Sequence, residues 1–208
     1  MTAAITVAMT ATQLTDGELM RLMLGGDKES FAELYRRRQR NVYRFALQMT
    51  GTPDLAEDVT QEVFMLLMRD GCAYDEARGS VNAFLLGVTR NYVLRRLKQE
   101  SFFVTMEDNV HDAPPRDQIN ASDTLLQGEA MQAMHRAVLN LPPHYREVVV
   151  LCELQELSYA EAAEVLGCAI GTVRSRLHRA RGILMEKLGT ARAETASTES
   201  LKSARCFA

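Results

Sequence analysis

The stretch from Ser158 to Leu188 constrains the fold more than any other part of the chain. Ser158, with Glu161 three residues later, forms a capping box, in which each side chain satisfies a backbone N–H at the start of a helix. Gly167 ends that helix, and a second helix follows whose apolar residues are spaced by four, three and four positions. These residues are Val173, Leu177, Ala180 and Leu184. Two helices separated by so short a glycine turn predict a helix-turn-helix.

The second helix of this motif carries a polar and cationic face opposite its apolar stripe. At roughly 100° per residue, Ser175 and His178 point furthest from the stripe. Arginine donates in a fork to guanine edges, and short polar side chains reach bases or phosphates. We predict that bases are read by Arg174, Ser175, His178 and Arg179, flanked by Thr172, and that phosphates are held by Arg146 and Arg176. The alternative is an ordinary charged face in water.

Helical signals recur along almost the whole chain, and strand-like alternation is rare, so the predicted fold class is all-α. We expect two small helical domains, at residues 13–99 and 123–188, the second of which contains the helix-turn-helix. Residues 100–122, with Pro114-Pro115 and many acids, predict a flexible linker. Residues 1–12 are expected to form a loose leader, and 189–208, rich in Ala, Ser, Thr and Glu, a disordered tail.

Charge is divided by segment, although the net charge is only −3. Five arginines and no acid lie between Tyr35 and Gln48, five basic residues and no acid between Ala77 and Gln99, and four arginines and no acid between Ile170 and Arg181. From Glu100 to Glu129, by contrast, seven acids stand against the single Arg116. Such segregation is typical of interaction surfaces, and the basic stretches suit a nucleic-acid partner.

The sequence also argues against several classes of protein. No apolar run approaches the roughly 18 residues that span a bilayer, so we expect no membrane insertion. The four cysteines form no C-x-x-C pair, which is typical of a reducing cytoplasm. The four histidines are dispersed, and neither a metal-binding motif nor a nucleophile motif is present. We therefore expect a cytoplasmic protein that is not an enzyme and has no cofactor or metal.

Several segments resemble the extracytoplasmic-function sigma factors, compact two-domain members of the main bacterial sigma family. LPPHYREV, LSYAEAAEVLG and GTVRSRLHRAR resemble their promoter-binding C-terminal domain. FAELYRRRQRNVYRFALQMTG, DLAEDVTQEVFMLLMR and FLLGVTRNYVLRRL are similar, in order and spacing, to their N-terminal domain. The resemblance covers about residues 15–188 and departs at Phe84, where many members carry tryptophan, and at Leu94, where many carry aspartate.

The resemblance implies a factor that binds RNA polymerase core and directs initiation at promoters with −35 and −10 elements. It implies docking on the clamp of the largest subunit, with Asp58, Gln61 and Glu62 as candidates, and on the flap of the second subunit. It implies that the helix-turn-helix reads the −35 element. For the opened −10 element the implied contacts are Arg78, Ser80, Asn82, Arg90, Asn91, Arg95 and Arg96. An anti-sigma factor is a further implied partner.

Two other interpretations remain open on the residues alone. One is a stand-alone helix-turn-helix regulator that dimerises on a palindrome. The other is an adaptor without DNA contact, against which the arginine-bearing helix face argues. Copurification with core polymerase distinguishes all three.

Overall fold

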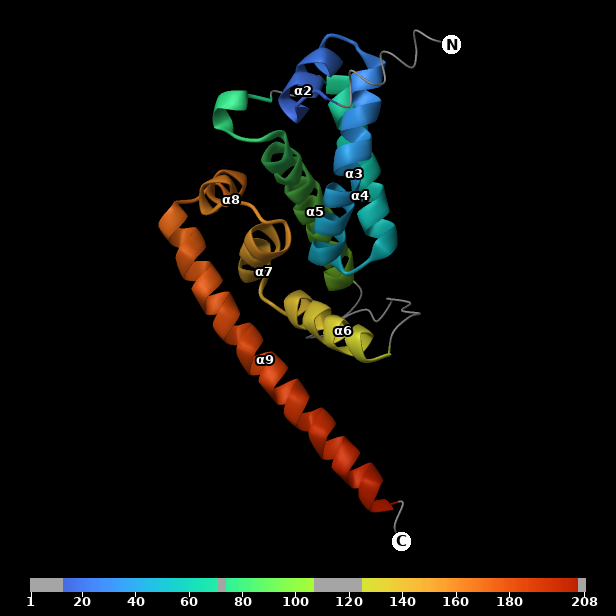
Figure 1. The fold of residues 1–208 in the computed structure, drawn as a ribbon, viewed down its shortest axis with the longest axis vertical. Helices are drawn as coiled ribbons and strands as arrows, with labels where there is room; N and C mark the ends of the chain where they lie inside the picture. The colour runs from blue at the N-terminus through green and yellow to red at the C-terminus, as the bar shows by residue number, and fades with distance from the viewer. Residues whose placement is uncertain (1–12, 71–73, 107–124, 206–208) are drawn as a thin grey trace.

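The computed structural model of the protein describes residues 13–70, 74–106 and 125–205. Every regular element in these ranges is a helix, which confirms the all-α prediction (Figure 1). The N-terminal helices are α2 (Asp16–Leu24), α3 (Lys28–Thr50), α4 (Pro53–Asp70), the 3-10 turn η1 (Glu76–Arg78) and α5 (Val81–Met106). The C-terminal helices are α6 (Leu125–Leu139), α7 (Pro143–Val149), the π-helical turn η2 (Val150–Leu154), α8 (Tyr159–Leu166) and α9 (Ile170–Arg205).

The N-terminal domain is built from α3, α4 and α5, with α2 packed across one end (Figure 1). The inward face of α4, with Val59, Val63 and Leu67, is buried as its helical spacing predicts. Phe45 of α3 and Leu86 of α5 are both fully buried in the same core. Burying side chains of this size stabilises a fold by about 1.5–3 kcal/mol each.

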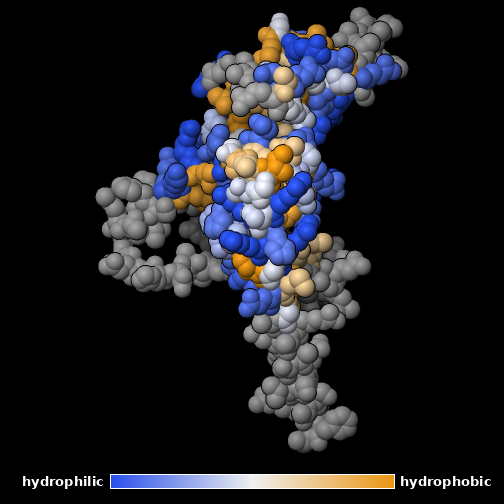
Figure 2. All heavy atoms as spheres, turned by 90° about the vertical axis from the view of Figure 1, so that its left-hand side faces the viewer, coloured by the Kyte–Doolittle hydropathy of each residue, from blue (hydrophilic) through white to orange (hydrophobic). Residues whose placement is uncertain are grey.

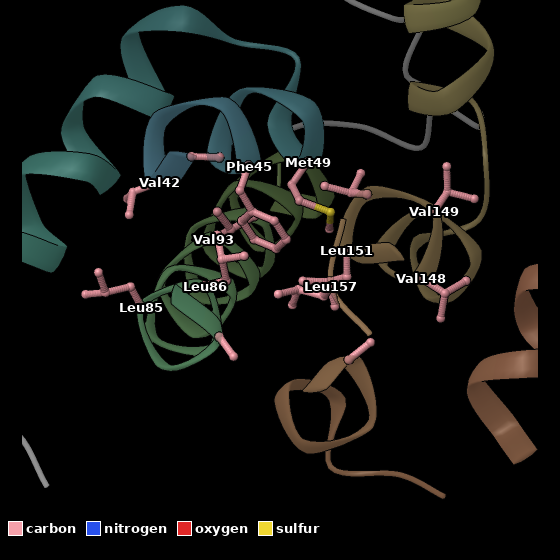
Figure 3. Packing of buried hydrophobic residues seen from close by; sticks show 14 of the residues in the cluster. Val42, Phe45, Met49, Leu85, Leu86, Val93, Val148, Val149, Leu151 and Leu157 are labelled. Atoms are coloured by element: carbon pink, nitrogen blue, oxygen red, sulfur yellow. The ribbon is translucent and has the colours of Figure 1, made fainter. Parts of the chain in front are cut away.

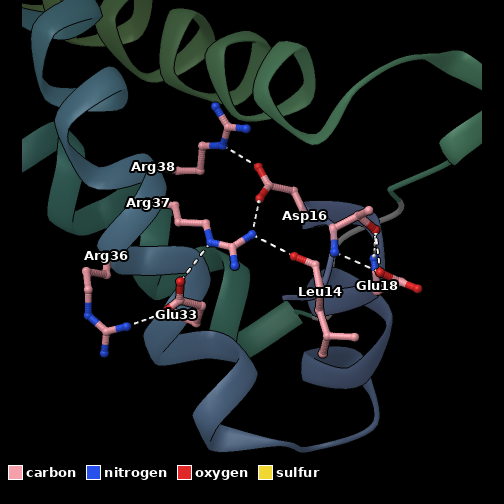
Figure 4. Close-up of polar contacts among 8 residues, drawn as sticks. Leu14, Asp16, Glu18, Glu33, Arg36, Arg37 and Arg38 are labelled. Carbon is pink, nitrogen blue, oxygen red and sulfur yellow. Dashed lines mark hydrogen bonds and ion pairs between the residues drawn. The ribbon is translucent and has the colours of Figure 1, made fainter. Parts of the chain in front are cut away.

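Ion pairs tie α2 to α3 (Figure 4). Arg37 lies at their centre: its Nη1 donates to the Leu14 carbonyl at 2.7 Å, and its Nε pairs with Glu33 at 2.8 Å. Arg36 also pairs with Glu33, and Arg38 pairs with Asp16. Three of the five arginines between Tyr35 and Gln48 are therefore matched by acids that lie outside that stretch, so it is not the open cationic patch that the sequence indicated.

The two domains share one hydrophobic core. Figure 3 shows Met49 of α3 beside Leu151 of η2, with Leu157 next to it, and all three side chains are buried. At the end of α3, Gly51 has a left-handed φ of 72°. A Cβ at Gly51 would lie only 2.9 Å from Cδ1 of Leu139 in α6. Sequence patterns predicted two domains, but not this contact between them.

Two boundaries differ from the prediction. The N-terminal domain is predicted to end at residue 99, but its last helix continues to Met106; residues 100–106 contain no glycine or proline that would end it. The tail predicted as disordered, 189–208, is helical as far as Arg205. Its alanines, glutamates and basic residues are strong helix formers, and the lone Gly189 costs only about 1 kcal/mol. The predicted leader, and the linker from residue 107 onward, lie outside the described residues.

Among the helices of the described ranges, none is both long enough and apolar enough to cross a membrane.

Candidate nucleic-acid and polymerase interfaces

The helix-turn-helix forms as its sequence predicts. The Glu161 backbone N–H donates to Ser158 Oγ at 3.2 Å, and the Ser158 N–H donates to Glu161 Oε2 at 3.1 Å, so the capping box is complete. Gly167 then takes a left-handed φ of 63°, a conformation that glycine adopts without a Cβ penalty. This turn aims the start of α9 away from α8.

The apolar stripe of α9 is buried and its opposite side faces solvent. Val173, Leu177 and Ala180 are at most 2% exposed. We call the opposite side the α9 face; its exposed members are Arg174, Ser175, His178 and Arg179, and Thr172 and Arg176 are half-buried at its edges. The surface on which α8 and the first half of α9 lie is mostly hydrophilic, with scattered apolar spots (Figure 2).

Contacts within the α9 face are local. Ser175 Oγ donates to the Thr172 carbonyl at 3.0 Å, one helical turn back. The Arg174 guanidinium lies 5.9 Å from the centre of the Tyr159 ring in α8, close enough for a weak cation–π attraction. The side chains of Arg174, His178 and Arg179 remain exposed to solvent.

Arg146 does not lie on the α9 face. Its Nη1 donates to the Met49 carbonyl at 2.6 Å, and its Nη2 donates to the Leu141 carbonyl at 3.2 Å and to the Leu139 carbonyl. Burial lowers the pKa of this guanidinium from its usual value. Carbonyls at helix ends lack helical partners, and a buried cation satisfies them. In this arrangement, Arg146 is therefore unavailable to a phosphate, contrary to the prediction.

We call the second polar surface the α5 face; its members are Ser80, Asn82, Arg90, Asn91, Arg95 and Arg96. Much of it is engaged by other parts of the chain. Arg90 forms a forked ion pair with Glu147 of α7, with Nε–Oε1 at 2.9 Å and Nη2–Oε2 at 3.2 Å. Ser80 Oγ donates to Glu161 Oε1 of α8 at 2.7 Å. The side chain of Arg78 lies outside the described residues.

The remaining α5-face residues have weaker or local contacts. Asn82 Oδ1 accepts from Asn41 at 3.4 Å, and Arg95 lies over the Tyr92 ring at 5.3 Å. Asn91 is exposed and lines a cavity of about 270 Å³ between α5 and α8. Phe84 also lines this cavity and packs edge-on against Tyr74, with ring centres 5.6 Å apart. Phe84, which departs from the family pattern, is thus packed against a second aromatic ring. Leu94, the other departure, is half-buried.

The outer side of α4 forms a third surface. Asp58 and Gln61 are exposed there, whereas Glu62 is half-buried and pairs with Arg96. This ion pair thus joins Glu62, a predicted docking residue, to the α5 face. Sequence reasoning missed Met65 and Met68 as surface residues; their side chains are 55% and 60% exposed beside a groove that Tyr92 also lines.

Sequence reasoning also missed Glu147. It follows Arg146 and precedes a run of valines, and an acid inside an apolar run is a signal that a cation is buried against it. Only the structure identifies that cation as Arg90, 57 residues away.

Comparisons with known proteins identify the family. Residues 34–103 match the family described as Sigma-70 region 2, and residues 131–184 match Sigma-70, region 4. The ECF RNA polymerase sigma factor SigE of Mycolicibacterium smegmatis is 34% identical over 81% of this chain and 65% of its own length, so the chain spans just under two thirds of that relative. The ECF RNA polymerase sigma factor SigM of Mycobacterium tuberculosis is 33% identical over 84% of this chain and 85% of its own length.

A solved structure of the sigma factor RpoE in complex with the anti-sigma factor NepR, from Bartonella quintana, has a similar fold. It is 25% identical, with a TM-score of 0.66 over 77% of this chain and 98% of that one. These matches do not favour a stand-alone regulator. Both domains match in order, and the chain covers 85% of SigM of Mycobacterium tuberculosis. The chain therefore belongs to the extracytoplasmic-function family of RNA polymerase sigma factors.

Proposed function

We propose that this chain binds RNA polymerase core and directs initiation at promoters that carry a specific pair of −35 and −10 elements. One observation supports this best: a single chain presents an arginine-bearing helix-turn-helix face, a separate polar and cationic face on α5, and a third, mixed surface on α4. A stand-alone regulator needs only the first of these.

The α9 face is the proposed reader of the −35 element. Arg174, Ser175, His178 and Arg179 are exposed together on one side of a helix whose other side is packed. A recognition helix in the major groove needs this combination of a rigid stripe and free donors. Arg176 lies nearer the packed side, which favours a phosphate contact over base reading.

The α5 face is the proposed binding surface for the opened −10 element. A single strand is held by cations along its backbone and by pockets or rings for its bases. Arg90, Arg95 and Arg96 supply the cations. Phe84 and Asn91 line the cavity of about 270 Å³, where an aromatic wall and an amide could hold an extruded base. Arg78, Ser80 and Asn82 complete the proposed contacts.

The α4 surface is the proposed docking site for the clamp of the polymerase's largest subunit. Asp58 and Gln61 lie beside the exposed side chains of Met65 and Met68. Exposed methionines adapt to a partner's surface, and flanking polar groups give specificity. Glu62 is a weaker candidate because Arg96 occupies its carboxylate. We further propose that the C-terminal domain meets the flap of the second subunit.

An anti-sigma factor is a further proposed partner. The solved relative from Bartonella quintana is bound to one, and its fold matches most of this chain. In the proposed function, the chemistry of RNA synthesis belongs to the polymerase, and this chain contributes recognition alone.

Transcription in vitro tests the proposal. Core polymerase, with and without the chain, is supplied with a library of promoter-length DNA fragments, and the start sites are sequenced. We expect the chain to produce starts at a limited set of fragments that share two motifs at a fixed spacing. The chain carrying Asp58→Ala and Gln61→Ala serves as a control that keeps both DNA faces. Starts that are no more selective with the chain than with core alone would contradict the proposal.

A further inference from the structure

We propose that Tyr159 positions Arg174 for base reading: its ring holds the guanidinium in place before DNA binds and leaves the N–H groups free to donate. Tyr159 is thereby a positioning residue, which acts through Arg174 rather than by contacting a base itself. This inference rests on the proposed reading of the −35 element by the α9 face. It concerns the place where α8 packs against the start of α9 (Figure 1).

The backbone that carries the Tyr159 ring is fixed on both sides. Tyr159 is the first residue of α8, and the capping box of Ser158 and Glu161 orders this turn. Leu157, two residues before the ring, is only 7% exposed, and Ala162 in the next turn is fully buried. Tyr159 itself is 38% exposed. The helix therefore presents this ring at the surface from a rigid support.

The backbone of Arg174 is fixed in the same way. It follows the buried Val173 and precedes the buried Leu177 by about one turn. The guanidinium carbon of Arg174 lies 5.9 Å from the centre of the Tyr159 ring, within the distance of about 6 Å over which a ring face attracts a cation. Both sides of this contact are anchored in the packed helix-turn-helix. The ring therefore restricts a long side chain whose ordering would otherwise cost entropy when DNA binds.

The chemistry of this contact suits base reading. Within the ranges that the structure describes, no acid pairs with Arg174. A carboxylate would occupy the N–H groups that a guanine edge needs, as Glu147 occupies those of Arg90. A ring attracts the guanidinium through the negative face of its π-system, and no N–H group has to be given up to an oxygen. Arg174 is thus held and still able to donate its fork.

The other two arginines nearby do not share this arrangement. Arg181, about two turns further along α9, pairs with Glu153 of η2, so its own position is set by an acid. Arg179, the second proposed base reader, has neither a ring nor an acid as partner among the described residues. The α9 face therefore contains one base reader that depends on Tyr159 and one that does not, which provides a control within the same helix.

A library of −35 duplexes tests the proposal, with binding to the full-length chain measured by fluorescence anisotropy. Arg174→Ala and Arg179→Ala first identify the base position that each arginine reads. Tyr159→Leu keeps apolar bulk and removes the ring. We expect it to lower the preference at the Arg174 position about two- to fivefold, the scale of a cation–π contact at an exposed site, and to leave the Arg179 position unchanged.

Two further variants control for the hydroxyl and for the loss of a tyrosine as such. Tyr159→Phe keeps the ring face, so both base preferences should stay as they are in the unmodified chain. Tyr92→Leu removes a ring that lies 5.3 Å from Arg95 in the N-terminal domain, and it should change neither preference. A loss in Tyr159→Phe that is equal for all sequences would overturn the proposal, because the hydroxyl would then be holding a phosphate.

A double-mutant cycle separates positioning from support of the fold. Added to Arg174→Ala, Tyr159→Leu should cause no further change in any base preference, since the side chain on which the ring acts is already gone. A further loss of affinity in that background would overturn the proposal, because the ring would then be acting on the rest of the helix-turn-helix.

NMR of the free full-length chain gives a measurement that does not depend on DNA. The Nε–Hε signal of Arg174 should shift in Tyr159→Leu, where the ring current is lost, and keep its position in Tyr159→Phe. An unshifted signal in Tyr159→Leu would refute the contact. Failure of Arg174→Ala to change any base preference would instead refute the proposed reading of the −35 element, because the NMR shift does not depend on that reading.

Discussion

Two helices of this protein carry arginines on a polar face, yet the two faces lie in different surroundings. On α9, the contacts of the exposed face stay within the C-terminal domain: Ser175 contacts Thr172, and Arg174 lies over the Tyr159 ring. On the α5 face, Arg90 and Ser80 are bound by carboxylates from 57 and 81 residues further along the chain. Helical periodicity thus determines which side of a helix is polar, whereas the packing of distant segments determines whether that side is free.

The largest effect is expected from removing Arg90. In Arg90→Ala, Glu147 would be left buried without its cation, and we expect the free energy of unfolding to fall by about 3 kcal/mol, near the low end for a broken buried pair because Arg90 is partly exposed. Urea unfolding followed by circular dichroism measures the change. Arg174→Ala on the exposed α9 face is the control and should change stability by less than about 0.5 kcal/mol. Similar losses for both variants would erase the contrast between the faces.

Next come the base-reading residues of the α9 face. Arg174→Ala and Arg179→Ala should each weaken binding to the −35 element by about 1–3 kcal/mol and relax the preference at one base position. Arg176→Ala should weaken binding to all sequences alike and lower the salt slope by about one unit. A library of −35 duplexes at two salt concentrations separates these outcomes. The reverse pattern would mean that reading and holding roles are exchanged.

A smaller effect is expected at the α4 surface, which belongs to neither face. Asp58→Ala with Gln61→Ala should weaken the complex with core polymerase by about 1–2 kcal/mol, the scale of ordinary interface truncations. Calorimetry with core polymerase measures it, and −35 duplex binding by the same variant should be unchanged. Unaltered polymerase affinity would place the docking site elsewhere.

The smallest effect concerns pH. The Ser80 hydroxyl, and then the capping bonds to Ser158, hold the pKa of Glu161 below its usual value of 4.5. A carboxyl whose folded pKa is lowered contributes stability above its unfolded pKa and loses it as the pH falls through the folded pKa. In Ser80→Ala we expect the pKa of Glu161 to rise, because the contact that lowers it most is lost. Carbon-detected NMR titration of the Glu161 carboxyl measures this. An unchanged pKa would mean that the contact between Ser80 and Glu161 does not persist in solution.

Local patterns predicted the helices and the polar side of α9 because the interactions that form them lie within a few residues. The capping box of Ser158 and Glu161 and the buried stripe through Leu177 are examples. The same reasoning could not find the partner of Arg90 or the carbonyls bound by Arg146, since those contacts join segments up to 97 residues apart. The charge of Arg146 is visible in the sequence and its burial is not, so the sequence alone groups this residue with the phosphate contacts.

The helical end at residues 189–205 was missed for another reason. Composition rich in Ala, Ser, Thr and Glu predicts disorder, but alanine and glutamate also favour helices, and the packed N-terminal half of α9 already nucleates this helix. Extending an existing helix costs far less free energy than nucleating a new one.

The glycine at the end of α3 has a consequence for engineering this protein. Gly51 combines a left-handed backbone with the close approach of Leu139, so the methyl group added in Gly51→Ala would strain the turn and push against the neighbouring domain. One methyl group would act there as a wedge. That single substitution would therefore probe the contact between the two domains, with every residue on the proposed polymerase-binding and DNA-reading surfaces left as it is.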